Sequence, residues 1–186
     1  MQLVVVDAGH GGRDSGAVGM YGVLEKDLNL KYAMALCESL HKFGVYAVPT
    51  RRDDRFIALE DRADVANVLD ADLFVSIHCN AFHDEQANGF EIWTSKHDID
   101  EPSCDLANMI CNDVGPNIPN LRMRGVKHGR LVVLDKTIGH SILIECGFIT
   151  NEDDYDVLCD DYIYKELIKS IRREIVLWLE DRKQNN

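Results

Sequence analysis

The chain has 186 residues, of which 46% are hydrophobic and 28% charged, so we expect one globular domain with a single core. Its 32 acidic residues outnumber 20 Lys and Arg residues, and the formal net charge is −12. Nucleic acid and anionic membrane surfaces are bound chiefly through Lys and Arg, so this balance argues against both as partners. It also disfavours unaided adhesion to an anionic cell wall.

The domain is expected to cover residues 1–182, followed by a C-terminal tail or linker start at 183–186. No apolar segment approaches the roughly 20 residues needed to span a bilayer. The first residues, Met1-Gln2-Leu3, lack the basic and apolar regions of a signal peptide. We therefore expect a protein made in the cytoplasm without an export signal in this chain.

Six cysteines are present, and none forms a Cys-x-x-Cys pair. Several fall within apolar helix or strand patterns. Buried free thiols are the favoured interpretation, against a disulfide framework or a thiolate metal site.

The first elements alternate between strand and helix. Residues 3–8 are apolar and β-branched, as in a buried strand, and a glycine-rich loop follows through Gly22. From Leu24 an apolar residue recurs every four positions, which predicts a helix that ends at Gly44.

A second strand is predicted at 45–50, and a helix at 59–69 with Leu59, Ala63, Ala66 and either Val65 or Leu69 facing inward. Further strands are predicted at 73–77 and at 90–93, where polar and apolar residues alternate.

The second half predicts a helix at 103–113 that Gly115-Pro116 ends, then a loop through 119–127. Strands are predicted at 131–134 and 141–144, before a C-terminal helix with a broad apolar stripe. This order predicts an α/β fold: an open, twisted, mostly parallel sheet of about six strands with helices on both faces.

Four side chains stand at turning points of this pattern. His10, His78 and Glu145 each close an apolar strand, and Glu25 opens the first helix. Ligands of open α/β sheets bind beyond the carboxyl ends of the strands, so these groups can converge. Zinc takes imidazole and carboxylate ligands, and a catalytic zinc needs three plus an open position for water. His10, Glu25 and His78 are the candidate ligands, which leaves Glu145 as candidate base.

Each group also has a plain structural interpretation. A histidine at a strand end is often only a hydrogen-bonded boundary residue. Glu25 would stabilise a helix start, and Glu145 would pair with an arginine. Topology alone leaves these alternatives open.

Several segments resemble, in family order, the zinc-dependent N-acetylmuramoyl-L-alanine amidases of the Amidase_3 type. The resemblance covers nearly the whole chain and rests on residues 6–17 (VDAGHGGRDSGA), 22–30 (GVLEKDLNL), Thr50-Arg51, Arg62, Ala66-Asn67, 71–81 (ADLFVSIHCNA) and 144–151 (IECGFITN).

The resemblance implies that His10, Glu25 and His78 bind one zinc ion and that Glu145 is catalytic. The family cuts the amide between the lactyl group of N-acetylmuramic acid and the L-alanine of the peptidoglycan stem. Ala8, Cys79 and His140-Ser141 depart from the usual pattern, but no departure removes a ligand or the base.

Peptidoglycan is therefore the expected partner, and the cell wall is the expected place of action after release or export. A bacteriophage or prophage endolysin is the preferred context. A sporulation enzyme or the catalytic module of a longer autolysin, with its wall-binding module outside this chain, fits equally.

Other candidate groups carry weaker signals. Neighbours on a strand face opposite sides, so the thiols of Cys79 and Cys146 should point into packing rather than act as nucleophiles. Asn80, two residues beyond His78, is a candidate to hydrogen-bond substrate or a turn residue. The remaining histidines are expected to be structural or solvent-facing: His41, His83, His97, His128 and His140.

The glycine loop lacks the Gly-Lys-Ser/Thr ending of a P-loop, so nucleotide binding is a poor alternative. Two other functions stay open. One is a zinc carboxypeptidase that acts on stem peptides, and the other is a peptidoglycan-binding module without turnover.

Overall fold

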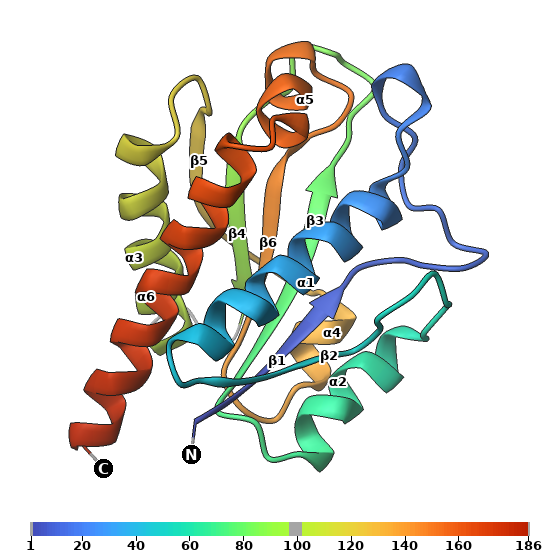
Figure 1. Cartoon of the computed structure of the whole chain (residues 1–186). Helices are drawn as coiled ribbons and strands as arrows, with labels where there is room; N and C mark the ends of the chain where they lie inside the picture. The colour runs from blue at the N-terminus through green and yellow to red at the C-terminus, as the bar shows by residue number, and fades with distance from the viewer. Residues whose placement is uncertain (1, 97–101, 186) are drawn as a thin grey trace.

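The computed structural model describes residues 2–96 and 102–185, which form one six-stranded sheet between two layers of helices (Figure 1). The strands are β1 (Leu3–Ala8), β2 (Tyr46–Pro49), β3 (Leu73–Asn80), β4 (Phe90–Ser95), β5 (Met123–Gly129) and β6 (Ser141–Phe148). The helices are α1 (Glu25–Lys42), α2 (Leu59–Val68), α3 (Pro102–Asn117), α4 (Val132–Lys136), α5 (Glu152–Cys159) and α6 (Ile163–Asn185), with a 3-10 turn at Met20–Gly22.

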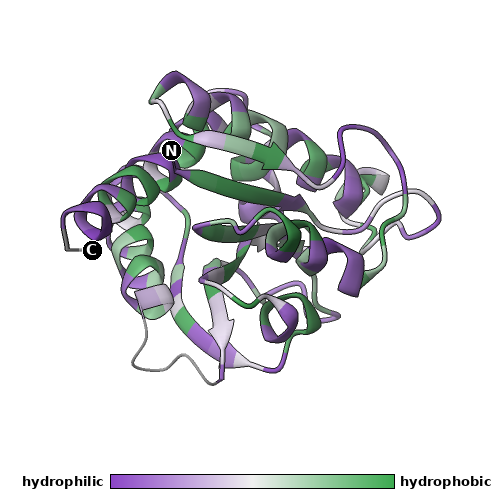
Figure 2. Ribbon diagram, turned by 90° about the horizontal axis from the view of Figure 1, so that it is seen from below, coloured by the Kyte–Doolittle hydropathy of each residue, from purple (hydrophilic) through white to green (hydrophobic). Residues whose placement is uncertain are grey.

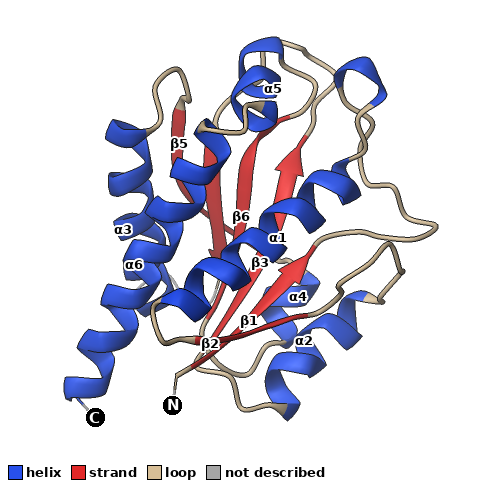
Figure 3. Cartoon of the chain, viewed as in Figure 1, coloured by secondary structure: helices blue, strands red, loops and turns tan. Residues whose placement is uncertain are grey.

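The strands are ordered β2-β1-β3-β6-β4-β5. The first four run parallel to one another, β4 is antiparallel to β6, and β5 is parallel to β4. The predicted α/β fold with a mostly parallel six-stranded sheet is therefore confirmed. Its helices cover both faces, as Figure 3 shows.

The larger core lies on the face that α1, α3 and α6 cover. It takes the side chains of Val4, Val6, Val75, Ile77 and Ile144 from the central strands. Parallel strands buried on both faces have nearly continuous apolar sequences, which explains why the sequence identifies β1, β3 and β6. Figure 2 shows β1 as a mostly hydrophobic strand between the helices.

The opposite face has a smaller core, made by Val5, Phe74 and Leu143 of the sheet with residues of α2 and α4. A cavity lined by residues of α2 and α4 adjoins the carboxyl ends of β1 and β3 on this face. His78 lies four residues beyond Phe74, and Glu145 lies two residues beyond Leu143. Alternate residues of a strand share a face, so His78 and Glu145 belong to this face.

Two predicted elements are wrong. Residues 131–134 form no strand; α4 begins at Val132 and buries Val133 and Leu134. A short β-branched run does not distinguish a strand from a buried helical turn. Residues 123–127 belong to β5 rather than to a loop, because pairing with β4 stabilises a segment that has no apolar alternation of its own.

Three helices differ in detail. α3 continues through Gly115 and Pro116, where the sequence predicts its end. In α2 the predicted inward residues Ala63 and Ala66 are buried. Of the two alternatives, Val65 packs against the smaller core and Leu69 is 42% exposed, and the predicted inward residue Leu59 is 50% exposed. α6 extends through Asn185, so residues 183–185 of the expected tail are helical.

Candidate active site

Three of the predicted site residues come together at the carboxyl end of the parallel strands. One ligand atom from each of His10, Glu25 and His78 lies within 4.8 Å of the others. His10 follows β1, Glu25 is the first residue of α1, and His78 belongs to β3. Three segments that are distant in sequence thus supply one cluster.

Glu25 is the centre of this cluster and is 6% exposed. Its Oε2 lies 3.2 Å from Nε2 of His10, and its Oε1 lies 3.0 Å from Nδ1 of His78. Two ligands that are each about 2.0–2.1 Å from a tetrahedral zinc ion stand roughly 3.3 Å apart. The two nitrogen–oxygen separations therefore fit a shared zinc ion without a large rearrangement.

Other groups fix the orientation of these side chains. The second ring nitrogen of His10, Nδ1, lies 2.9 Å from Oδ2 of Asp14. Glu25 accepts hydrogen bonds from the backbone N–H of Ala17 at 2.9 Å and from the Asn29 amide at 3.2 Å. A carboxylate behind a ligand histidine is a common arrangement in metal sites, since it selects the tautomer.

Glycines allow this close approach. A Cβ added at Gly9 would lie 2.3 Å from two atoms of the His78 ring. A Cβ at Gly16, whose φ is +62°, would lie 2.5 Å from Oε2 of Glu25 and 2.7 Å from the His10 ring. The glycine loop thus encloses the three candidate ligands rather than a phosphate.

A buried ion pair stabilises the start of the glycine loop. Arg62 Nη1 lies 2.8 Å from Oδ1 of Asp7, and the two side chains are 2% and 0% exposed. Arg62 also donates to the carbonyl oxygens of Ala8 at 2.6 Å and His10 at 2.7 Å. His10 has a φ of 59°, which is uncommon for a residue with a side chain, so these bonds hold an unfavourable conformation.

Glu145 lies beside the cluster without joining it. It is the register partner of His78 on β3 and of Glu91 on β4, so the three side chains form a row across one face of the sheet. Oε2 of Glu145 is buried and has no hydrogen-bond partner in the described part of the chain. This oxygen atom is thus available to accept a proton.

The electrostatics divide the carboxylates into two kinds. Burial raises the pKa of Glu25, but hydrogen bonds from His10 and His78 outweigh it and hold that pKa well below its usual value. Burial raises the pKa of Glu145 to about 7; the charge of His78 opposes this shift, while Glu25 and Glu91 add to it. One carboxylate stays ionised as a ligand must, and the other can exchange a proton near neutral pH.

The two histidines are shifted in the same direction. Burial lowers the pKa of His10, but the hydrogen bonds and charges of Glu25 and Asp14 outweigh it and raise that pKa to about 9. The pKa of His78 is also raised, because the Glu25 hydrogen bond and the Glu145 charge exceed the effect of burial. Both rings thus lie in a negative environment that attracts a cation.

The sequence profile of the N-acetylmuramoyl-L-alanine amidases matches residues 4–176. The chain belongs to this amidase family. YqiI of Bacillus subtilis is 41% identical over 157 residues, which are 84% of this chain and 75% of YqiI. The N-acetylmuramoyl-L-alanine amidase LytC of B. subtilis is 36% identical over 165 residues, 89% of this chain, but the chain spans only 33% of LytC.

The structure of N-acetylmuramoyl-L-alanine amidase AmiC2 of Nostoc punctiforme superposes with a TM-score of 0.90 at 36% identity. The match covers 96% of this chain and 97% of AmiC2. LytC and AmiC2 are named for a hydrolytic activity, so the chain is an amidase-family enzyme.

A cavity of about 410 Å³ adjoins the cluster of His10 and His78 in this amidase. His10, His78 and Arg62 line one side, and apolar residues line the rest: Phe56, Ile57, Leu59, Leu131, Val132, Val133 and Leu143. A concave, mostly apolar space beside convergent polar groups is the usual form of a ligand site.

Sequence reasoning missed a second buried acid beside Glu145. Glu91 is 3% exposed and accepts hydrogen bonds from Arg124 Nε at 2.6 Å, Trp93 Nε1 at 3.0 Å and Asn80 Nδ2 at 3.2 Å. The predicted substrate contact Asn80 is thus tied to Glu91. The alternation in 90–93 was the available signal, since it places Glu91 and Trp93 on one face.

The other cysteine and histidine side chains named above occupy structural or surface positions where the structure describes them. The side chains of Cys79 and Cys146 are fully buried in the larger core, as predicted. His41 accepts a hydrogen bond from Ala47, and His83 is exposed. Nδ1 of His128 lies 2.8 Å from Oγ1 of Thr94. His97 lies outside the described residues.

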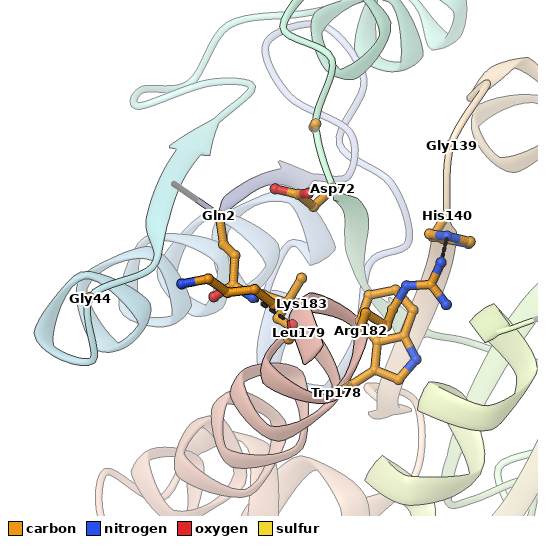
Figure 4. Close-up of a pocket in the computed structure, with 10 residues that line it drawn as sticks. Gln2, Gly44, Asp72, Gly139, His140, Trp178, Leu179, Arg182 and Lys183 are labelled. Atoms are coloured by element: carbon orange, nitrogen blue, oxygen red, sulfur yellow. Dashed lines mark hydrogen bonds between the residues drawn. The ribbon is translucent and has the colours of Figure 1, made fainter. Parts of the chain in front are cut away.

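Another cavity, of about 570 Å³, lies at the opposite end of the sheet. Figure 4 shows Arg182 between His140 and Trp178, with Gln2 bonded to Leu179 on the other side. These contacts join the end of α6 to the residues just before β1 and β6. The cavity holds none of the candidate catalytic groups.

Proposed function

We propose that this amidase hydrolyses the amide bond between the lactyl group of N-acetylmuramic acid and the L-alanine of the peptidoglycan stem. The observation that carries the proposal is the convergence of His10, Glu25 and His78, with a buried Glu145 oxygen beside them that has no partner among the described residues. LytC and AmiC2 are named for this activity, which supports the choice of bond.

His10, Glu25 and His78 would hold one zinc ion. Two imidazoles and one carboxylate match zinc's preference for nitrogen and oxygen ligands, and their spacing fits the ion. When bound, zinc supplies a Lewis acid that lowers the pKa of water and polarises a carbonyl. Asp14 would keep His10 in the tautomer whose Nε2 lone pair faces the site.

Glu145 would act as the general base. Its carboxylate takes a proton from the attacking water and delivers it to the leaving nitrogen of L-alanine. A raised pKa suits both steps, because the group has to bind a proton and release it near neutral pH. Asn80, on the same face and held by Glu91, is proposed to hydrogen-bond the substrate.

The cell wall is the proposed place of action. Among the described residues, no helix is long and apolar enough to cross a membrane. The chain spans a third of the length of LytC. An endolysin, a sporulation enzyme and an autolysin module all use the same chemistry.

Product analysis tests the function. Purified peptidoglycan is digested with and without a metal chelator, and the fragments are identified by mass spectrometry. We expect a new lactyl carboxyl group and a free L-alanine amine, both absent with chelator. Loss of a terminal D-alanine instead would indicate a carboxypeptidase, and binding without any cleavage would indicate a module that does not turn over.

A further inference from the structure

One segment of this acidic protein is strongly basic. Residues 122–130 contain Arg122, Arg124, Lys127 and Arg130 and no acidic residue, although acidic residues outnumber basic ones by 32 to 20 in the chain. We call these four residues the basic strip. They lie on β5 and just beyond both its ends.

The basic strip is close to the candidate catalytic base. β5 is the edge strand next to β4, as Figure 1 shows. Across the sheet, Glu145 pairs with Glu91, and Glu91 pairs with Gly125 of β5. Adjacent strands lie about 4.8 Å apart, so β5 is roughly 10 Å from Glu145.

Lys127 points to the same face as Glu145. It is the register partner of Trp93, which packs on the smaller core beside Leu143. Its neighbour Val126 packs against the larger core on the opposite face. Since successive residues of a strand alternate between faces, the Lys127 side chain belongs to the catalytic face.

The charge of Lys127 has no partner among the described residues. Its ammonium has no hydrogen bond or ion pair with any residue in 2–96 or 102–185. Arg124 differs, because Nε bonds to Glu91 at 2.6 Å and Nη1 to the carbonyl of Asn88 at 3.3 Å. Arg124 is 31% exposed, so its guanidinium is fixed in place yet accessible at the surface.

The lining of the cavity on the other side of the site holds no comparable group. The cavity of about 410 Å³ has mainly apolar walls, and its buried arginine, Arg62, is already paired with Asp7. A carboxylate placed there would lose hydration without gaining a free donor. The two sides of the scissile bond therefore meet opposite kinds of surface.

We propose that Lys127 and Arg124 form a subsite for a free carboxylate on the peptide side of the substrate. This inference rests on the proposed function and gives the substrate a direction, with the stem peptide running from Glu145 toward β5. An extended chain advances about 3.3–3.6 Å per residue, so roughly 10 Å corresponds to the second or third stem residue.

The test uses two soluble muramoyl peptides that differ at the second stem residue, one with a free carboxylate and one with the matching carboxamide. Lys127→Met is expected to raise KM about fivefold to tenfold on the carboxylate substrate, with kcat and carboxamide cleavage unchanged. Lys127→Arg should keep the parent KM on the carboxylate substrate. Lys127→Glu should raise this KM more than Lys127→Met does.

Lys42→Met is the matched control, because it removes an exposed lysine at the far end of α1. Arg124 is left intact, since its removal would leave the buried Glu91 without its positively charged partner.

Equal KM values for parent, Lys127→Met and control on both cleaved substrates would overturn the subsite while the proposed function stands. A loss confined to intact walls would point to another wall polymer and would also overturn it. Failure of the parent to cleave either substrate would refute the proposed function itself.

Discussion

His78 and Glu145 are register partners on the adjacent parallel strands β3 and β6, and both side chains lie on the same face of the sheet. The sheet itself therefore sets the separation between a candidate metal ligand and the candidate base. Neither residue depends on a flexible loop for its position. Two predictions for the Glu145→Gln variant follow from this arrangement.

Glu145→Gln should abolish most turnover while it leaves metal binding intact. Glutamine keeps the size of the side chain but cannot take a proton from water, and general bases contribute about 10²–10⁴-fold in rate. We expect kcat on peptidoglycan to fall within that range. Metal content, measured by elemental analysis after dialysis, serves as the control, because a variant that lost metal and activity together would implicate Glu145 as a ligand instead.

The same variant should change the pH dependence of stability in the metal-free protein. The folded pKa of Glu145 is raised to about 7. Folding thus favours the protonated form, so the free energy of unfolding decreases as pH rises from the unfolded pKa toward 7. Ionised Glu145 would cost about 1–3 kcal/mol at pH 8.

Glu145→Gln removes this cost, so its Tm should exceed that of the parent at pH 8 and match it near pH 4.5. Thermal unfolding followed by circular dichroism in the presence of chelator measures both. Parallel Tm profiles for the two proteins across this range would contradict the raised pKa.

Asp14→Asn should weaken metal binding without loss of fold. The amide oxygen can still accept the backbone N–H of Gly16, which Oδ1 of Asp14 accepts at 3.0 Å. The negative charge behind Nδ1 of His10 is lost, and such outer groups contribute about 10–100-fold in metal affinity. Competition with a chromophoric chelator gives the Kd for zinc. Asp53→Asn, at an exposed carboxylate paired with Arg55, should leave that Kd unchanged.

How far the sequence predicts this molecule depends on where its stabilising contacts lie. β1, β3 and β6 were predictable because parallel strands in the centre of a sheet are apolar on both faces. β5 was not, because an edge strand with Arg124, Lys127 and His128 has no apolar pattern of its own and is held by pairing with β4. The prediction of a strand at residues 131–134 was wrong for the opposite reason. Val132 and Val133 favour a strand locally but pack as a helical turn in α4.

The candidate site shows the same division. His10, Glu25, His78 and Glu145 were found from strand ends and from the family resemblance. The groups that support them were given no role, because their contacts cross the fold. Arg62 reaches Asp7 and the carbonyl of His10, and Arg124 reaches Glu91, over separations of 55, 52 and 33 residues. No local periodicity carries such pairings.

Gly9→Ala should disturb the metal site through space rather than through backbone strain. Gly9 and Gly139 both lack a positive φ, so alanine is compatible with either backbone. At Gly9 the new Cβ would lie 2.3 Å from Cε1 and Nε2 of His78, whereas at Gly139 the nearest atom, the carbonyl oxygen of Ala71, is at 3.4 Å. The His78 ring must move away in the first variant, which separates its Nδ1 from Glu25.

We expect Gly9→Ala to lose zinc affinity at least tenfold and to lose about 1–3 kcal/mol of stability from overpacking, while Gly139→Ala changes neither. Zinc titration and denaturant unfolding measure the two effects, and wild-type zinc affinity in Gly9→Ala would show that the His78 ring position is not needed for binding.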